Sequence, residues 1–210
     1  ERDIKVRNWA NRQKISWHEP TQNGVIRCLK SRDGWAKNWK KRMLMPSFKA
    51  PVTLEKIIEP TQNIPKPIEL GLKPLVRNER PQKGGLNQAF RTLNSFLHER
   101  GEFYANTMSS PLTAFHNCSR LSAHIAFGAI SIRDVFQACE LRHQKVKETP
   151  RETRGKWPSA FRAFAGRLRW HCHFIQKLED EPRIEYENMH SAYDNVRNEN
   201  LHEDSFLAWQ

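Results

Sequence analysis

Seven prolines between residues 46 and 83 restrict the fold of this chain more than any other sequence feature. They stand at positions 46, 51, 60, 65, 67, 74 and 81. Each proline fixes its own φ and disfavours helical backbone at the preceding residue. We therefore expect an extended linker over residues 51–83, which separates an N-terminal part, residues 1–50, from a C-terminal part, residues 84–210.

The N-terminal part has the pattern of a small α/β remnant. Residues 2–12 mix apolar and charged positions and predict a short amphipathic helix, whereas the alternation in residues 14–18 predicts a strand. A second helix is predicted over residues 32–45. Its apolar face consists of Trp35, Trp39 and Met43.

The C-terminal part is predicted to be mainly helical, because apolar residues recur every three or four positions. Helices are expected over residues 86–100 and 119–127, a third with Ser131 as its N-cap, and a fourth over residues 159–178. The basic stretch 143–156 is expected to be an exposed loop. The predicted buried residues are Phe90, Leu93, Phe127, Phe136, Phe161, Phe164 and Leu168.

The charge balance favours an anionic partner. Lys and Arg outnumber Asp and Glu by 35 to 23, which gives a formal net charge of +12. Such a charge favours DNA, RNA or a membrane surface, although a solvated basic surface is the simpler alternative. No apolar stretch approaches the roughly 20 residues that span a bilayer, and no signal peptide is evident, so we expect a cytoplasmic protein. The start at Glu1 and the apolar run before Gln210 suggest that both ends are cut.

The cysteines predict reduced thiols and no metal site. The four cysteines lie far apart, without a C-x-x-C pair. The run His171-Cys172-His173 contains metal-ligand types, but adjacent residues on a helix point about 100° apart. These three side chains are therefore not expected to converge on one ion.

Several motifs in the C-terminal part, taken in order, resemble those of the photolyase and cryptochrome family. The first is Gly84-Gly85 with the helix that follows, and Tyr104 and Pro111 come next. C-S-R-L-S at 118–122 is similar to the family's T-S-R-L-S, and F-G-A-I-S at 127–131 is similar to the family's F-G-x-x-S. L-R-W-H-C-H-F at 168–174 resembles L-x-W-R-E-F, and F-L-A-W-Q at 206–210 looks like the start of F-x-A-W-x-x-G-x-T-G-Y-P. The resemblance covers residues 84–210 well and residues 1–50 more loosely.

This resemblance implies a mainly α protein, the first half of a helical FAD-binding domain preceded by a remnant of an α/β antenna domain. The implied function is light-driven, FAD-dependent repair of UV-damaged DNA, with no particular antenna chromophore or oligomeric state specified. The implied cofactor-binding residues are Tyr104, Cys118, Ser119, Arg120, Leu121, Ser122 and Phe164. The implied DNA- and lesion-binding residues are Trp170, Arg167 and His171. The parts of the family that contact the flavin ring most closely follow Gln210, so FAD binding by these 210 residues alone is expected to be weak.

Ser119 and Ser122 also suggest phosphate binding by themselves. They stand three residues apart, and on one helix they would share a face near its N-terminus, where hydroxyls and unpaired backbone N–H groups bind a diphosphate. The alternative is helix capping alone. Cys118 stands where the family usually has a Thr, and its thiol is a weak hydrogen-bond donor.

Two departures from the family pattern leave other functions open. Arg167 lies where repair enzymes usually carry a lesion-binding Glu, and a guanidinium cannot accept a hydrogen bond. His171 replaces the usual Arg. Trp170 retains the ring that stacks on a flipped base, although a tryptophan at this spacing is often a core residue. A cryptochrome-like photoreceptor and a cofactor-free, basic nucleic-acid-binding module are therefore the alternatives.

Overall fold

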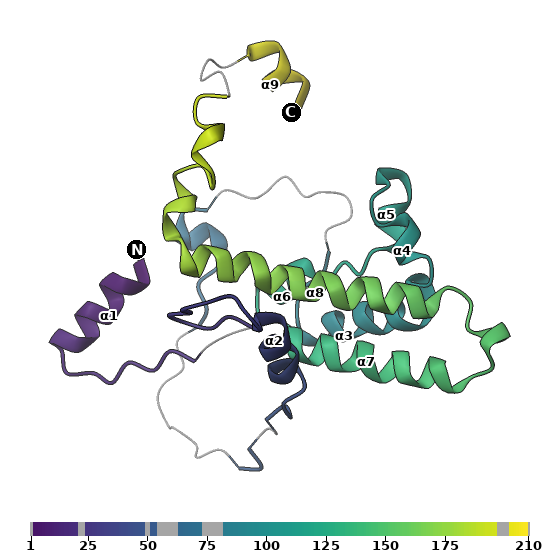
Figure 1. Cartoon of the computed structure of the whole chain (residues 1–210). Coiled ribbons are helices and arrows are strands. Elements are labelled where there is room, and N and C mark those ends of the chain that lie inside the picture. Colours follow the sequence, from purple (N-terminus) through teal and green to yellow (C-terminus); the bar gives the residue numbers. More distant parts are fainter. Residues whose placement is uncertain are drawn as a thin grey trace. The chain divides into compact units, whose positions relative to one another are not determined.

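The computed structural model describes residues 2–20, 24–48, 51–53, 63–72, 82–196 and 202–209, and within these ranges it is mainly α-helical without a strand (Figure 1). The α-helices are α1 (Arg2–Arg12), α2 (Trp35–Met43), α3 (Leu86–Ser95), α4 (Tyr104–Thr107), α5 (Pro111–Asn117), α6 (Ser122–Ala126), α7 (Ile132–Glu148), α8 (Trp157–Asp180) and α9 (Glu203–Trp209). A π-helical turn, Phe96–Arg100, continues α3, and 3₁₀ turns span Pro67–Leu70, Arg151–Thr153, Pro182–Glu185 and Ser191–Tyr193.

The predicted N-terminal helices are confirmed, but the predicted α/β remnant is wrong. α1 and α2 form as expected, and the apolar face of α2 is buried. Residues 14–18 have no regular secondary structure. Ile15 and Trp17, which suggested a strand, are 49% and 38% exposed. Alternation predicts a strand only where a neighbouring strand completes its hydrogen bonds, and none exists among the described residues.

Much of the proline-rich stretch lies outside the described residues. Residues 51–53 and 63–72 are exposed, and their only helical turn is Pro67–Leu70. Its first position is a proline, which tolerates this place because it needs no N–H there. The linker over residues 51–83 remains a prediction.

Contacts within the chain form two compact units. The first unit comprises Glu1–Trp39 and Arg169–Gln210, and the second comprises Lys40–Leu168. Helices α2 and α8 each contribute residues to both.

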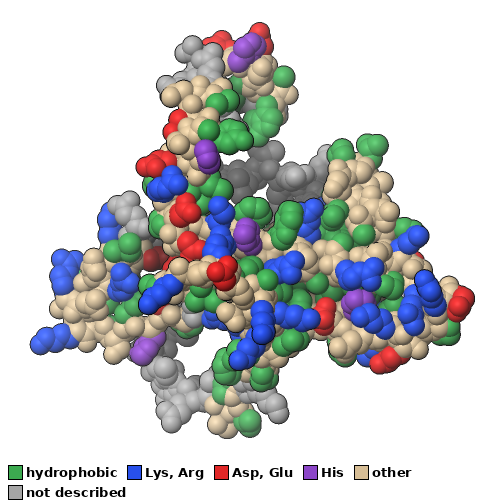
Figure 2. Space-filling view, viewed as in Figure 1, with side chains coloured by type: hydrophobic (Ala, Val, Ile, Leu, Met, Phe, Trp, Pro, Cys, Tyr) green, Lys and Arg blue, Asp and Glu red, His purple; other side chains and the backbone are tan. Residues whose placement is uncertain are grey.

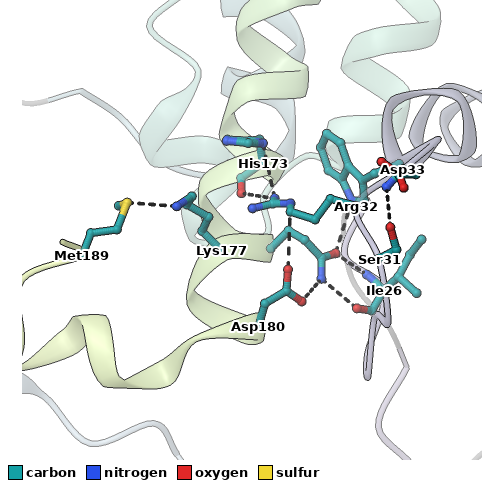
Figure 3. A network of polar contacts seen from close by, with 10 residues as sticks. Ile26, Ser31, Arg32, Asp33, His173, Lys177, Asp180 and Met189 are labelled. Atoms are coloured by element: carbon teal, nitrogen blue, oxygen red, sulfur yellow. Dashed lines mark hydrogen bonds and ion pairs between the residues drawn. The ribbon is translucent and has the colours of Figure 1, made fainter.

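The first unit has a small core around Trp39 and Cys172. The backbone N–H of Gly24 donates to Cys172 Sγ at 3.4 Å. A Cβ atom on residue 24 would lie 1.8 Å from Trp39 Cδ1, so only glycine fits there. Nearby, Arg32 donates to the His173 carbonyl at 3.3 Å and lies 4.0 Å from the Asp180 carboxylate (Figure 3). The segment before α2 is thereby fixed to the C-terminal half of α8.

The second unit is built on α3, α7 and α8. Its α7 begins as predicted, because Ser131 Oγ accepts a hydrogen bond from the Arg133 N–H at 3.1 Å. The predicted loop from residue 143 is wrong at its start, since α7 continues to Glu148 with His143 and Val146 buried. Gln144, Lys145, Lys147 and Glu148 are good helix formers. The buried His143 and Val146 stand three residues apart, which places them on the same face of the helix.

Most predicted core positions of the second unit are confirmed. Leu93, Phe136, Phe161, Phe164 and Leu168 are each no more than 5% exposed. The predicted burial of Phe90 and Phe127 is wrong, because they are 42% and 90% exposed. Phe127 follows the last residue of α6, where the short helix ends and no longer holds its side chain on the buried face.

Candidate functional site

Three aromatic rings form the centre of the candidate site in the second unit. The rings of Phe96 and Phe164 lie 4.6 Å apart, and Tyr104 meets them edge-on at 5.4 and 5.8 Å. Gly101 permits the turn into α4, because a Cβ there would lie 2.3 Å from the Phe96 carbonyl oxygen. Aromatic pairs at such distances are favourable beyond their buried area. The structure therefore brings together Tyr104 and Phe164, both predicted from the resemblance to bind the cofactor.

The hydroxyl of Tyr104 is neutral at physiological pH. It is 7% exposed, and burial raises the pKa of its hydroxyl to about 12, with the neighbouring Cys118 adding to the rise and Arg167 opposing it. Burial also raises the pKa of the Cys118 thiol, against the nearby guanidinium groups of Arg100 and Arg120. At neutral pH the thiol is therefore protonated, and its Sγ lies 4.0 Å from the Met108 carbonyl oxygen.

Arg100 fixes the segment that contains Cys118 and Ser119. Its guanidinium donates to the carbonyl oxygens of both residues, the second at 2.7 Å. It also donates to the Thr92 carbonyl at 3.2 Å and to Ser95 Oγ at 3.1 Å. One half-buried cation thus connects α3 to a loop that lies about twenty residues later in the sequence.

The same segment presents two backbone N–H groups on its other side. In a trans peptide the C=O and the following N–H point in opposite directions. Because the carbonyls of Cys118 and Ser119 point at Arg100, the N–H groups of Ser119 and Arg120 point away from it. No described residue accepts a hydrogen bond from either N–H. Arg120 has φ +59°, a left-handed conformation typical of anion-binding turns.

The predicted arrangement of Ser119 and Ser122 on one helix is wrong. Helix α6 begins at Ser122, and the left-handed Arg120 separates Ser119 from it. Ser119 Oγ accepts a long hydrogen bond, 3.5 Å, from the Leu121 N–H and keeps its own proton free to donate. Leu121 is buried and Ser122 is exposed, so Leu121 contributes its backbone rather than its side chain to this surface.

A basic pocket of about 440 Å³ lies beside this segment. The Arg120 guanidinium stands over the Phe115 ring, 4.1 Å from its centroid, and the Gln82 side-chain amide donates to the Arg120 carbonyl at 2.6 Å. The lining residues are Gln82, Arg91, Thr92, Ser95, Arg100, Phe115, His116 and Arg120.

The predicted lesion-binding residues lie along one helix. Arg167, Trp170 and His171 are spaced three and four residues apart on α8, which places them on one face, and all three are exposed. Trp170 is 51% exposed, and Phe174 meets its ring edge-on at 6.3 Å. Although His171 is exposed as a residue, partial desolvation of its ring lowers its pKa, which favours the neutral form.

Three neighbouring residues of α8 face different surroundings. His171 is exposed, Cys172 accepts from the Gly24 N–H inside the first unit, and the His173 ring lies 5.8 Å from that of Trp35. The described ranges hold no group of three or more His, Cys, Asp or Glu side chains arranged to bind a metal ion.

Sequence reasoning did not identify Arg100, Arg91 or His116. An arginine in the last turn of a helix is common, and nothing in the local sequence indicates that its guanidinium reaches the carbonyls of Cys118 and Ser119. The signal that points to this region is the resemblance of residues 118–122, which concerns the loop and not its support.

Basic side chains extend beyond the pocket. On the face drawn in Figure 2, Lys and Arg outnumber Asp and Glu over α7 and the first part of α8. Helix α7 itself carries Arg133, Arg142, Lys145 and Lys147. None of the helices in the described ranges is long and apolar enough to cross a membrane.

Comparison of the chain with protein-family models, with curated protein sequences and with solved structures finds no match in any of the three.

Proposed function

We propose that the protein containing this chain is an FAD-dependent flavoprotein that repairs UV-damaged DNA in light, as the resemblance to photolyases implies. Three observations support the proposal. The family-like motifs occur in order, residues 84–178 are mainly helical as such a domain requires, and Tyr104, Cys118 and Phe164 belong to one cluster.

The observation that carries the proposal is the pair of N–H groups at Ser119 and Arg120, for which no acceptor is present in the part of the chain that the structure describes. Adjacent N–H groups that point the same way, next to a left-handed residue, suit the oxygens of a diphosphate. The free protons of the Ser119 and Ser122 hydroxyls add two side-chain donors. Arg100 keeps the loop in this conformation by holding its carbonyls on the opposite side.

The remaining residues fit an FAD site in distinct ways. Ser119, Arg120, Leu121 and Ser122 would hold the two phosphates, mainly through backbone N–H groups and hydroxyls. Tyr104, neutral up to about pH 12, would donate from its hydroxyl. Cys118, in the place of a Thr, offers a protonated but weak donor, and Phe164 supplies apolar ring surface.

The chemistry of repair would come from the cofactor, since reduced FAD supplies an electron after it absorbs light. The chain's own part is to bind DNA and orient the lesion. The formal charge of +12 favours phosphate backbones, and the exposed Trp170 ring suits stacking on a flipped base. Arg167 and His171, on the same face of α8, would contact the DNA near that base.

A photoreceptor without repair activity is the second candidate, and Arg167 favours it. This side chain is exposed on the face that carries Trp170, where repair requires a hydrogen-bond acceptor. A guanidinium has donors only, so it cannot replace the carboxylate of a repair enzyme. In that case the flavin site is the same and the response to light passes to a partner protein.

The flavin proposal is tested by the colour and cofactor content of the full-length protein that contains residues 1–210, purified in the dark. We expect a yellow protein with bound FAD, and a clear fall in the flavin-to-protein ratio in the double variant Ser119→Ala/Ser122→Ala. Each hydroxyl bond to a charged phosphate contributes roughly 1.5–3 kcal/mol. The matched control Ser191→Ala/Ser205→Ala removes two exposed hydroxyls elsewhere and should keep the wild-type ratio. A colourless wild-type protein that still binds DNA would favour the cofactor-free module.

A further inference from the structure

The basic pocket beside residues 118–122 has a composition that indicates a second kind of ligand. Three arginines and His116 line it, and no Asp or Glu is among the described residues that line it. The other lining groups are one aromatic ring, Phe115, and uncharged hydrogen-bonding side chains.

Within the described ranges, no carboxylate forms an ion pair with the arginines of this pocket. The four hydrogen bonds of Arg100 go to carbonyl and hydroxyl oxygens, which accept them without carrying a negative charge. Arg120 lies over the Phe115 ring, and Arg91 is exposed on α3. Arg100 and Arg120 both line the pocket, and the charge of Arg120 adds to burial in lowering the pKa of Arg100. Two cations that line one pocket favour an anion between them.

We propose that this pocket binds a phosphorylated small molecule, with Arg91 and Arg120 in contact with the phosphate. A planar guanidinium matches phosphate oxygens with two parallel hydrogen bonds, and arginine is the residue best suited to this contact. A volume of about 440 Å³ lies within the usual range for small-molecule sites and exceeds what a lone phosphate fills. The exposed Phe115 ring and the Thr92 and Ser95 side chains therefore face the rest of the ligand.

This pocket is distinct from the diphosphate site proposed above, although both include Arg120. The loop carbonyls of Cys118 and Ser119 point toward Arg100, which lines the pocket, whereas the N–H groups proposed to hold FAD point away from it. Tyr104 and Phe164 do not line the pocket. The inference needs only a phosphate group and holds whether or not the protein binds a flavin.

The direct test is titration of the flavin-free chain with inorganic pyrophosphate, followed by calorimetry and by ¹⁵N-detected amide shifts. We expect saturable binding at about millimolar concentration or below. The largest shifts should fall on Thr92, Ser95 and His116. Arg91→Gln and Arg120→Gln should each weaken binding about tenfold, because each removes charge-assisted hydrogen bonds. Arg162→Gln, an exposed arginine of α8 outside the pocket, should leave the affinity unchanged.

The amide shifts keep the test informative if a variant fails to fold, because they need only the wild-type chain. Absence of binding, shifts that avoid the pocket, or an equal loss in Arg162→Gln would each overturn the proposal. The source of the phosphate is decided by repeating the titration with FAD bound. Undiminished pyrophosphate binding would identify a separate phosphorylated ligand, whereas competition would assign the pocket to phosphates of the flavin itself. A wild-type protein that binds pyrophosphate in this pocket but carries no flavin would contradict the proposed function alone.

Discussion

The side-chain amide of Gln176 pairs with the backbone of Ile26 in both directions, as a neighbouring strand would. Gln176 Oε1 accepts from the Ile26 N–H at 2.7 Å, and its Nε2 donates to the Ile26 carbonyl at 2.8 Å. The same amide accepts from the Trp35 indole at 3.3 Å and donates to Asp180 Oδ1 at 2.7 Å. Gln176 is fully buried, and both polar atoms of its side chain have two partners. A helix residue thus satisfies the polar backbone groups of a loop segment, in a part of the structure where no strand is described.

Replacement of Gln176 by Leu should destabilise the first unit by about 2–3 kcal/mol. The variant keeps the size of the side chain but leaves the part-buried backbone groups of Ile26 and the buried Trp35 indole N–H without partners, and each such group costs roughly 1–3 kcal/mol. Urea unfolding, followed by tryptophan fluorescence, measures the loss. Gln144→Leu makes the same change at an exposed position of α7 and should alter stability by about 0.5 kcal/mol at most. Equal stability of the two variants would contradict this role.

Replacement of Arg100 by Lys should destabilise the second unit by about 2 kcal/mol, although the charge is kept. An ammonium group has three donors on a single atom and cannot reach four acceptors on two segments, as the guanidinium does. Thermal or urea unfolding would detect the change. Arg91→Lys, on the exposed side of the same helix, is the matched control and should be nearly neutral. A wild-type stability for Arg100→Lys would indicate that the loop holds its conformation without the guanidinium.

The helices of this chain could be predicted from sequence where one face is apolar over several turns. α8 follows this pattern, with Phe161, Phe164, Leu168 and Cys172 buried at intervals of three and four. Residues 14–18 show the opposite case, because alternation predicts a strand only if a partner strand is present, and the described residues contain none.

The candidate site was only partly predictable. Tyr104, Cys118 and Phe164 were identified by resemblance, and the structure brings them together. The left-handed backbone at Arg120 was not predictable, because a non-glycine residue gives no local signal for positive φ. The role of Arg100 depends on contacts between segments that are distant in sequence.

Acidification should destabilise the second unit through His143. Burial lowers the pKa of this histidine, the charges of Lys147 on α7 and Arg162 on α8 lower it further, and Glu140 partly opposes them. Since the folded pKa lies below the unfolded value of about 6.5, the contribution to stability is present above pH 6.5 and is lost as the pH falls through the folded pKa.

The variant His143→Gln should therefore show a smaller loss of stability between pH 7.5 and 5.5 than the wild type. Histidines 98, 171 and 173, whose pKa values are also lowered, remain in both proteins, so the difference reports His143. Urea midpoints at the two pH values supply the measurement. His18→Gln, at an exposed position outside the helices, is the control and should keep the wild-type pH dependence. The idea fails if both variants respond to pH in the same way.

Replacement of Trp170 by Ala should separate repair from signalling. If the exposed indole stacks on a flipped lesion, the variant should lose roughly 1–3 kcal/mol of affinity for DNA that contains pyrimidine dimers. Contacts to phosphates do not depend on the lesion, so affinity for undamaged DNA should remain nearly unchanged. Trp17→Ala removes another partly exposed tryptophan and should affect neither affinity.

Binding of the flavin-loaded protein should be measured on damaged and undamaged duplexes at two salt concentrations, before and after illumination. Arg167 should raise the affinity for both duplexes at low salt, because its charge acts on the backbone, and Arg167→Gln should lower both about equally. A wild-type protein that prefers damaged DNA and removes dimers in light would support repair. If the wild-type protein shows neither property, the lack of a hydrogen-bond acceptor at position 167 accounts for the loss of repair. A photoreceptor then becomes the better explanation of the same flavin site.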